Sequence, residues 1–154
     1  GDIWGPTDVY GVRLPLPEGS QHIILGQVTK RNGPRTNDIH FGLKPTDDEA
    51  VEGKKNDPMM PVTWIKSYQV PGGKKGRVYT TTMGSSTDLV VEGSRRMMVN
   101  GVYWLLDLEI PKGGTKVDLT GKFDPKEYSF RRGDYWPKQN KRPADFRLKR
   151  EKNK

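Results

Sequence analysis

The chain contains no cysteine and two histidines in 154 residues. Without cysteine it has no disulfide bond, no thiolate nucleophile and no cysteine-ligated zinc, while its compartment stays open. His22 and His40 have no metal-ligand spacing. An acidic cluster also lacks the alternating Asp/Asn, the glycine and the final glutamate of a calcium loop. It consists of Asp47, Asp48, Glu49 and Glu52. We predict no metal site, and the sequence indicates no particular cofactor.

Hydrophobic residues are also scarce, at 32% of the chain with a mean hydropathy of -0.85. No apolar run approaches the roughly 18 residues that a membrane-spanning helix needs, so we expect no membrane partner. The 18 glycines and 12 prolines indicate long loops between few regular elements. Trp4 precedes any element long enough to bury it, which suggests that the chain is a fragment of a longer polypeptide.

The net charge of +8 lies entirely in the C-terminal tail. Residues 1–111 hold 13 basic and 13 acidic side chains, whereas residues 112–154 hold 14 basic and 6 acidic ones. Aromatic residues alternate with these bases, so the tail could contact phosphates and stack on bases. They are Tyr128, Phe130, Tyr135, Trp136 and Phe146. No nucleic-acid-binding motif precedes the tail, and we favour a solvated terminal extension without a nucleic-acid partner.

Strands are predicted at residues 9–14 and 23–28, which favour β structure and are separated by a proline- and glycine-rich turn. Residues 29–61 show no sustained period and are predicted to form a long loop. The strongest hairpin pattern follows, with residues 62–70 and 77–83 joined by a six-residue connection containing Pro71 and three glycines.

A helix is predicted over residues 87–108, where apolar residues recur at helical spacing. Met97 and Met98 lie on this apolar stripe and are assigned to the core, and Gly101 on the same face would allow another backbone to approach. Any of the four polar residues at 85–88 could cap the helix start. Pro111 and the glycine pair that follows are predicted to end it.

The turn between strand and helix, "GSSTD" at residues 84–88, has the geometry on which many enzymes mount a nucleophile or bind a phosphate. A nucleophile elbow needs a second glycine where Asp88 stands, and a Walker A loop needs a Gly-Lys-Ser/Thr that is missing. Anion binding at the helix start stays open, although Asp88 could take that place itself. We favour a structural cap.

Several segments resemble the C-terminal part of the trehalose-utilisation (ThuA-like) domain family. The most specific are "KNDPMMPV", "TTTMG" and "RRMMVNGVYW", which occur in the same order as in secreted or periplasmic-type members. The resemblance covers most of residues 1–121 and weakens beyond. It implies a flavodoxin-like α/β fold related to class I glutamine amidotransferases, with a mainly parallel sheet. This chain would supply about four strands and one long helix, followed by an irregular tail at residues 122–154.

The family is linked to sugar metabolism, especially of trehalose and related disaccharides, with no assigned reaction. Many members have a Gly-His pair where this chain has Gly84 followed by Ser85, so no acid–base role is carried over. Whether the chain is an enzyme is left open, and no catalytic residue is assigned. The residues expected near a carbohydrate ligand are Asn56, Asp57, Thr82, Gly84, Ser85 and Ser86. For Asn56 and Asp57 the alternative is a turn before Pro58.

Two tryptophans, Trp64 and Trp104, could stack on a sugar ring, but we favour core or interface roles for both. The missing N-terminal part of the same domain is the other expected partner. The alternative function is a non-catalytic interaction module of a larger secreted protein. Nucleic-acid binding through the tail is a third hypothesis.

Overall fold

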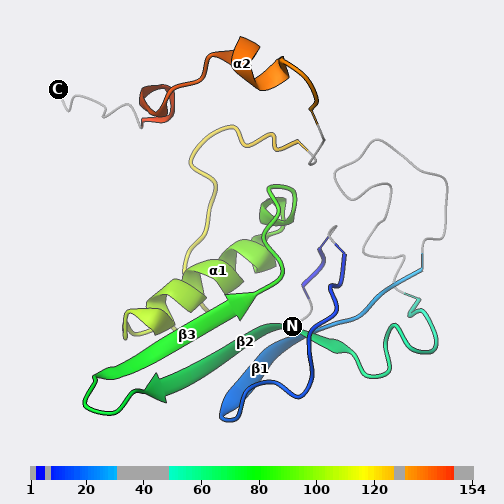
Figure 1. Ribbon diagram of the computed structural model, residues 1–154, viewed down its shortest axis with the longest axis vertical. Helices are drawn as coiled ribbons and strands as arrows, with labels where there is room; N and C mark the ends of the chain where they lie inside the picture. The colour runs from blue at the N-terminus through cyan, green and yellow to red at the C-terminus, as the bar shows by residue number, and fades with distance from the viewer. Residues whose placement is uncertain (1–2, 6–7, 31–48, 127–130, 148–154) are drawn as a thin grey trace.

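The computed structural model describes residues 3–5, 8–30, 49–126 and 131–147 (Figure 1). In chain order its elements are β1 (Ser20–Gly26), β2 (Met60–Gln69), β3 (Lys75–Thr81), the 3₁₀ helix η1 (Asp88–Val90), α1 (Glu92–Leu105), the short helix α2 (Tyr135–Gln139) and the 3₁₀ helix η2 (Pro143–Phe146). The predictions for His40, Asp47, Asp48, Tyr128 and Phe130 lie outside the described residues. The mixed α/β class is confirmed.

The sheet has the order β1-β2-β3, and both neighbouring pairs are antiparallel. β2 and β3 form the predicted hairpin, with Thr63 opposite Thr81 and Gln69 opposite Lys75. Its connection covers residues 70–74 and is shorter than predicted, because β3 begins before the last glycine of the turn. The described part of the chain therefore has three strands and antiparallel pairing, where the resemblance implies about four strands and a mainly parallel sheet.

The predicted strand at residues 9–14 is wrong, and β1 starts and ends earlier than the predicted run at 23–28. Val9, which precedes β1, packs on the sheet instead of pairing with it. A Cβ atom on Gly26 would lie 2.7 Å from Val62 Cγ1 and 2.9 Å from Val9 Cγ1. The missing side chain at Gly26 thus lets Val9 pack closely on the sheet face that α1 leaves open.

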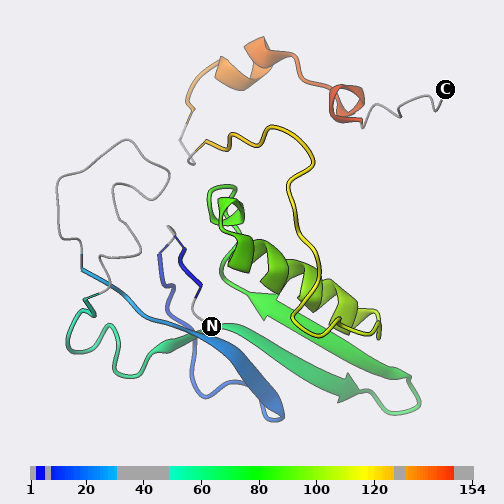
Figure 2. The ribbon, with the colours of Figure 1, turned by 180° about the vertical axis from the view of Figure 1, so that it is seen from behind.

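α1 packs on the other face of the sheet (Figures 1 and 2). Met97 is buried at 8% exposure, which confirms its core assignment, while Met98 is partly exposed. The Thr63 hydroxyl of β2 lies 3.4 Å from Met97 Sδ. A Cβ atom on Gly101 would lie 2.8 Å from two ring carbons of Tyr79. The close approach predicted at Gly101 is therefore made by a side-chain ring of β3 and not by a backbone.

α1 is shorter than the predicted helix at both ends. At its start, Val91 has an extended backbone (ψ 125°) and separates α1 from η1. At its end, Asp107 adopts a positive φ of 59°, and Leu108 N donates to Tyr103 O at 2.9 Å. Asp107 N also donates to Trp104 O at 3.2 Å, which completes a Schellman motif. The helix thus stops before Pro111 and the glycines that were predicted to end it.

The chain then returns along α1, and side chains of the helix attach it by hydrogen bonds (Figure 2). Asn100 Oδ1 accepts hydrogen bonds from Thr115 N at 3.1 Å and from Thr115 Oγ1 at 2.9 Å. Arg95 Nε donates to Val117 O at 2.9 Å. Beyond this segment, residues 131–147 are exposed throughout, including Trp136 at 63% and Phe146 at 72%. The proposed boundary between residues 121 and 122 stays a prediction.

Candidate functional site

The corner between β3 and α1, residues 82–88, is organised by the carboxylate of Asp88. This side chain is fully buried, and its Oδ2 accepts hydrogen bonds from Gly84 N at 2.9 Å and Ser85 N at 3.0 Å. The Asp88 amide donates back to Ser85 O at 3.1 Å. An acidic side chain thus occupies the two amides that could have bound an anion, as the structural interpretation expected.

Asp88 does not cap the long helix, however. Asp88 stabilises the turn before η1, whereas α1 begins after Val91 with no side-chain cap. The prediction that a residue at 85–88 caps the long helix is therefore wrong. The reason is local: the carboxylate reaches the amides of the preceding turn, and the extended Val91 interrupts the helical backbone.

Two distant segments also meet at the corner. A Cβ atom on Gly5 would lie 3.0 Å from Met83 Cε and 3.4 Å from Asp88 Oδ1, so the N-terminal segment packs on this turn. The Ser86 hydroxyl donates to Lys126 O at 2.8 Å and connects the start of the tail to it. The corner is thus a junction of three parts of the chain.

Four of the predicted ligand residues gather here. Thr82 is partly exposed, and its amide extends the hydrogen bonding between β3 and β2 by donating to Val62 O at 2.9 Å. Ser85 is partly exposed, with its hydroxyl 2.9 Å from Thr87 Oγ1. Gly84 and Ser86 are exposed. Three hydroxyl groups and an exposed glycine therefore share one end of β3.

The other two predicted ligand residues lie elsewhere, in the segment that precedes β2 (Figure 1). Asn56 Oδ1 accepts from Val28 N at 2.7 Å, and Nδ2 donates to Val28 O at 2.8 Å and to Val51 O at 2.7 Å. Both amide protons and one acceptor position are therefore used in joining two backbone segments. Asp57 is exposed. Asn56 thus has a structural role, and the contact of either residue with a ligand stays a prediction.

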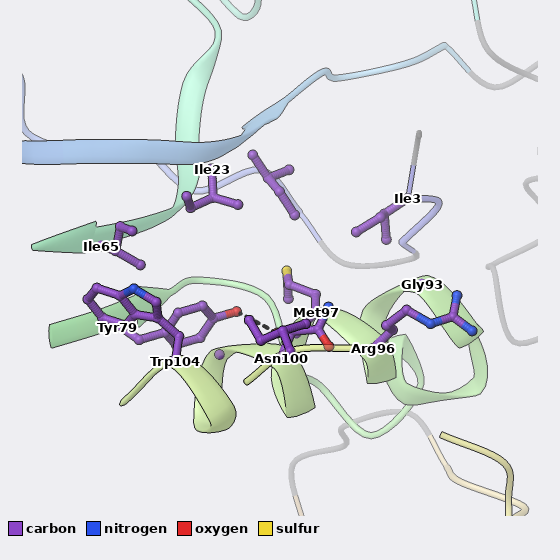
Figure 3. Close-up of a pocket in the computed structure, with 12 residues that line it drawn as sticks. Ile3, Ile23, Ile65, Tyr79, Gly93, Arg96, Met97, Asn100 and Trp104 are labelled. Atoms are coloured by element: carbon purple, nitrogen blue, oxygen red, sulfur yellow. Dashed lines mark hydrogen bonds between the residues drawn. The ribbon is translucent and has the colours of Figure 1, made fainter. Parts of the chain in front are cut away.

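A groove of about 500 Å³ opens between α1 and the sheet (Figure 3). Its walls are mostly apolar and come from four parts of the chain, namely the N-terminal segment, β1, the β2–β3 hairpin and α1 with the residues after it. The lining residues are Ile3, Ile23, Ile24, Ile65, Tyr79, Gly93, Arg96, Met97, Asn100, Gly101, Trp104 and Ile110. Its volume lies within the range of roughly 300–1,000 Å³ that is typical of small-molecule sites.

The rings of Tyr79 and Trp104 form one end of this groove (Figure 3). Burial raises the pKa of the Tyr79 phenol above its ordinary value of 10.0, and the nearby Thr63 hydroxyl opposes part of this rise. Trp104 is fixed by Arg77, whose guanidinium carbon lies 5.3 Å from the ring centre and whose Nη1 donates to Trp104 O at 2.6 Å. Arg77 Nη2 also donates to Asp107 Oδ1 at 2.6 Å.

Sequence reasoning did not predict the groove. Its helix side follows a visible pattern, since Gly93, Met97, Gly101 and Trp104 recur at helical spacing. We used that pattern only to assign Met97 to the core, where it does lie, and not to infer a groove beside it. Trp104 lines the groove, and its core or interface role stays a prediction. Trp64 belongs to the opposite sheet face, because it pairs with Thr80 and alternates with Ile65 on the helix side.

Within the described ranges, no cluster of three or more His, Asp or Glu side chains could hold a metal ion. None of the helices in this part of the chain is long and apolar enough to cross a membrane. No protein-family model matches the chain, and comparisons with curated proteins and with solved structures find no relative.

Proposed function

We propose that this chain is the C-terminal part of a flavodoxin-like ThuA-like domain associated with the metabolism of trehalose or related disaccharides. In this proposal the corner at residues 82–88 lines the carbohydrate site. The observation that carries the proposal is the turn held by Asp88 at the end of β3, beside three clustered hydroxyl groups. Hydroxyls both donate and accept, which suits the hydroxyl groups of a sugar.

The corner contributes binding rather than acid–base chemistry in this proposal. Ser85 stands where many family members have histidine, and a serine hydroxyl does not titrate near neutral pH. Asp88 is buried and already holds two backbone amides, so its role is to fix the turn. Ser86 is exposed, and its hydroxyl oxygen keeps acceptor capacity while its proton bonds to Lys126 O.

The test is calorimetric titration of the chain with trehalose and with an oxidised trehalose derivative. Ser85→Ala and Ser86→Ala should each weaken binding by about threefold to tenfold, because each removes one hydrogen-bonding group. Ser67→Ala is the matched control, since Ser67 is an exposed hydroxyl on β2 away from the corner. Equal affinity in all three variants would remove the corner from the site. No binding to the unmodified chain would reject the proposal.

A second partner, the N-terminal part of the same domain, is favoured by the sheet face opposite α1. Val78 and Tyr68 lie on that face and are 39% and 47% exposed. Apolar side chains gathered on one sheet face are typical of a surface that another layer covers. The same observation favours the alternative function, a non-catalytic interaction module. The two functions predict different residues in the polypeptide that precedes residue 1. In a ThuA-like domain, that polypeptide should bring acid–base or ligand-binding side chains to the corner, and in an interaction module it should not.

The tail supports the nucleic-acid hypothesis only through its charge and exposed rings. Residues 131–147 carry six basic and two acidic side chains. At about 150 mM salt we expect either no detectable affinity for mixed-sequence DNA or RNA, or an affinity that decreases steeply when the salt concentration is raised. Tight, salt-resistant binding would instead favour the nucleic-acid hypothesis.

A further inference from the structure

The groove between α1 and the sheet has chemically different ends (Figure 3). Tyr79 and Trp104 form the aromatic end, and isoleucines from β1 and β2 form the apolar wall above them. Arg96 lies toward the other end, near Ile3, with Asn100 between (Figure 3). A ligand that fits this groove must therefore combine an apolar body with a polar group.

The hydrogen bonds of Asn100 decide what that polar group is. Its Oδ1 accepts from the Thr115 amide, which is always a donor, so the orientation of the side-chain amide is defined. Oδ1 also accepts from the Thr115 hydroxyl at 2.9 Å, which occupies its second acceptor position. Asn100 Nδ2 donates to no other described residue. What Asn100 offers the groove is thus a donor.

Arg96 adds a second donor, on a guanidinium whose charge is paired with Glu92. Its Nε donates to Thr115 O at 3.2 Å, and its Nη2 pairs with the carboxylate of Glu92. Nη1 has no hydrogen-bond partner among the described residues. A Cβ atom on Gly114 would lie 2.5 Å from Arg96 Cδ, so the side-chain stem is closely packed. The guanidinium is therefore held in place by three contacts that leave Nη1 available.

The ion pairs beside the groove leave no net charge there, so the preference for an acceptor group rests on the unused donors of Asn100 and Arg96. Glu92 is paired with Arg96 along one turn of α1, and Asp107 is paired with Arg77 beyond the Trp104 end. Glu109 is exposed and follows the helix end. No carboxylate is among the residues that line the groove.

We propose that this groove binds a small amphipathic carboxylate. Its apolar body would lie between the isoleucine wall and the rings of Tyr79 and Trp104, and its carboxylate would accept hydrogen bonds from Asn100 Nδ2 and Arg96 Nη1. The inference does not depend on the carbohydrate proposal, because it concerns other residues and another ligand chemistry.

The test compares three probes of one size: 4-phenylbutyrate, the neutral 4-phenylbutanamide and the cationic 4-phenylbutylamine. Binding to the 154-residue chain is measured by calorimetry. 4-Phenylbutyrate should bind about tenfold or more tightly than the amide, because hydrogen bonds to a charged group are worth at least that ratio. The amine should bind most weakly.

Asn100→Asp is the decisive variant. It keeps an acceptor for both Thr115 bonds and replaces only the donor with a negative oxygen, so it should fold while losing at least the tenfold preference and favouring the amine. Asn140→Asp makes the same change at an exposed tail position and should leave the order of the probes unchanged. If Asn100→Asp does not fold, Arg96→Lys, which keeps the charge and loses the fork of donors, should still reduce the preference for 4-phenylbutyrate.

Three results would overturn the proposal. Equal binding of the acid and the amide would make this a plain apolar surface. An unchanged preference in Asn100→Asp would remove Asn100 from the site. No binding of any probe, together with a dimer in sedimentation experiments, would indicate that a second copy covers the groove. Trehalose titrations of the same samples report on the corner separately.

Discussion

Replacing Asn56 by alanine distinguishes a structural residue from a ligand residue. The variant loses three hydrogen bonds of 2.7, 2.8 and 2.7 Å, to Val28 N, Val28 O and Val51 O. Each such bond contributes about 0.5–1.5 kcal/mol net, so we expect the free energy of unfolding to fall by about 2–4 kcal/mol. For a chain of this length that corresponds to a melting temperature on the order of 10 °C lower. Asp57→Ala, at the exposed neighbour, should stay within about 0.5 kcal/mol of the unmodified chain.

The assay is urea denaturation followed by circular dichroism, with trehalose titration of the same samples. Asn56→Asp provides a closer comparison, because it keeps the acceptor for Val28 N and loses both donors. It should be destabilised at least as much as the alanine variant, since its carboxylate would face two carbonyl oxygens. If Asn56→Ala unfolds like the unmodified chain but no longer binds trehalose, the structural interpretation of Asn56 is wrong.

Three further predictions concern the corner and the groove. Asp88→Ala leaves two partly buried amides without their acceptor, so the free energy of unfolding in urea should fall by about 2–4 kcal/mol. Ser86→Ala, the comparison, should lower it by about 0.5 kcal/mol. Equal losses in the two variants would contradict the role of the carboxylate. The raised pKa of Tyr79 means that the unfolded chain ionises first, so stability from this group is complete below about pH 10 and lost as pH rises through the folded pKa. Between about pH 9 and 11 the free energy of unfolding of Tyr79→Phe should therefore fall less than that of the unmodified chain. An equal fall in both proteins over this pH range would refute the prediction. Gly101→Ala should cost about 1–3 kcal/mol against the Tyr79 ring, offset by about 1 kcal/mol of helix propensity. In a Tyr79→Leu background the same change should be neutral or stabilising.

The hairpin could be predicted because its signals are local. Residues 62–70 alternate, and the glycines after Pro71 supply the turn. The pairing of Thr63 with Thr81 follows from that geometry. The presence of a helix at residues 92–105 could also be predicted from the helical spacing of its apolar residues, but the positions of its ends could not. They depend on Asp88 reaching back to Gly84 and on the left-handed backbone at Asp107.

The rest depends on contacts between residues far apart in the chain. The apolar residues at 9–14 have β propensity, but the segment forms no strand, and packing against Gly26 decides the position of Val9. Asn56 has a sequence context equally suited to a turn and to a ligand, and its partner Val28 lies across a long connection. The groove needs Ile23, Ile65 and α1 to meet, which no local period reveals.

Backbone amide NMR of the labelled chain during titration with trehalose tests the central claim most directly, because it follows the amides of the whole chain in one experiment. We predict that the largest shift changes fall on residues 82–88 at the end of β3, and that residues 96–104 along the groove change little with this ligand. No change with trehalose, or changes confined to the groove, would contradict the assignment of the corner as the carbohydrate site.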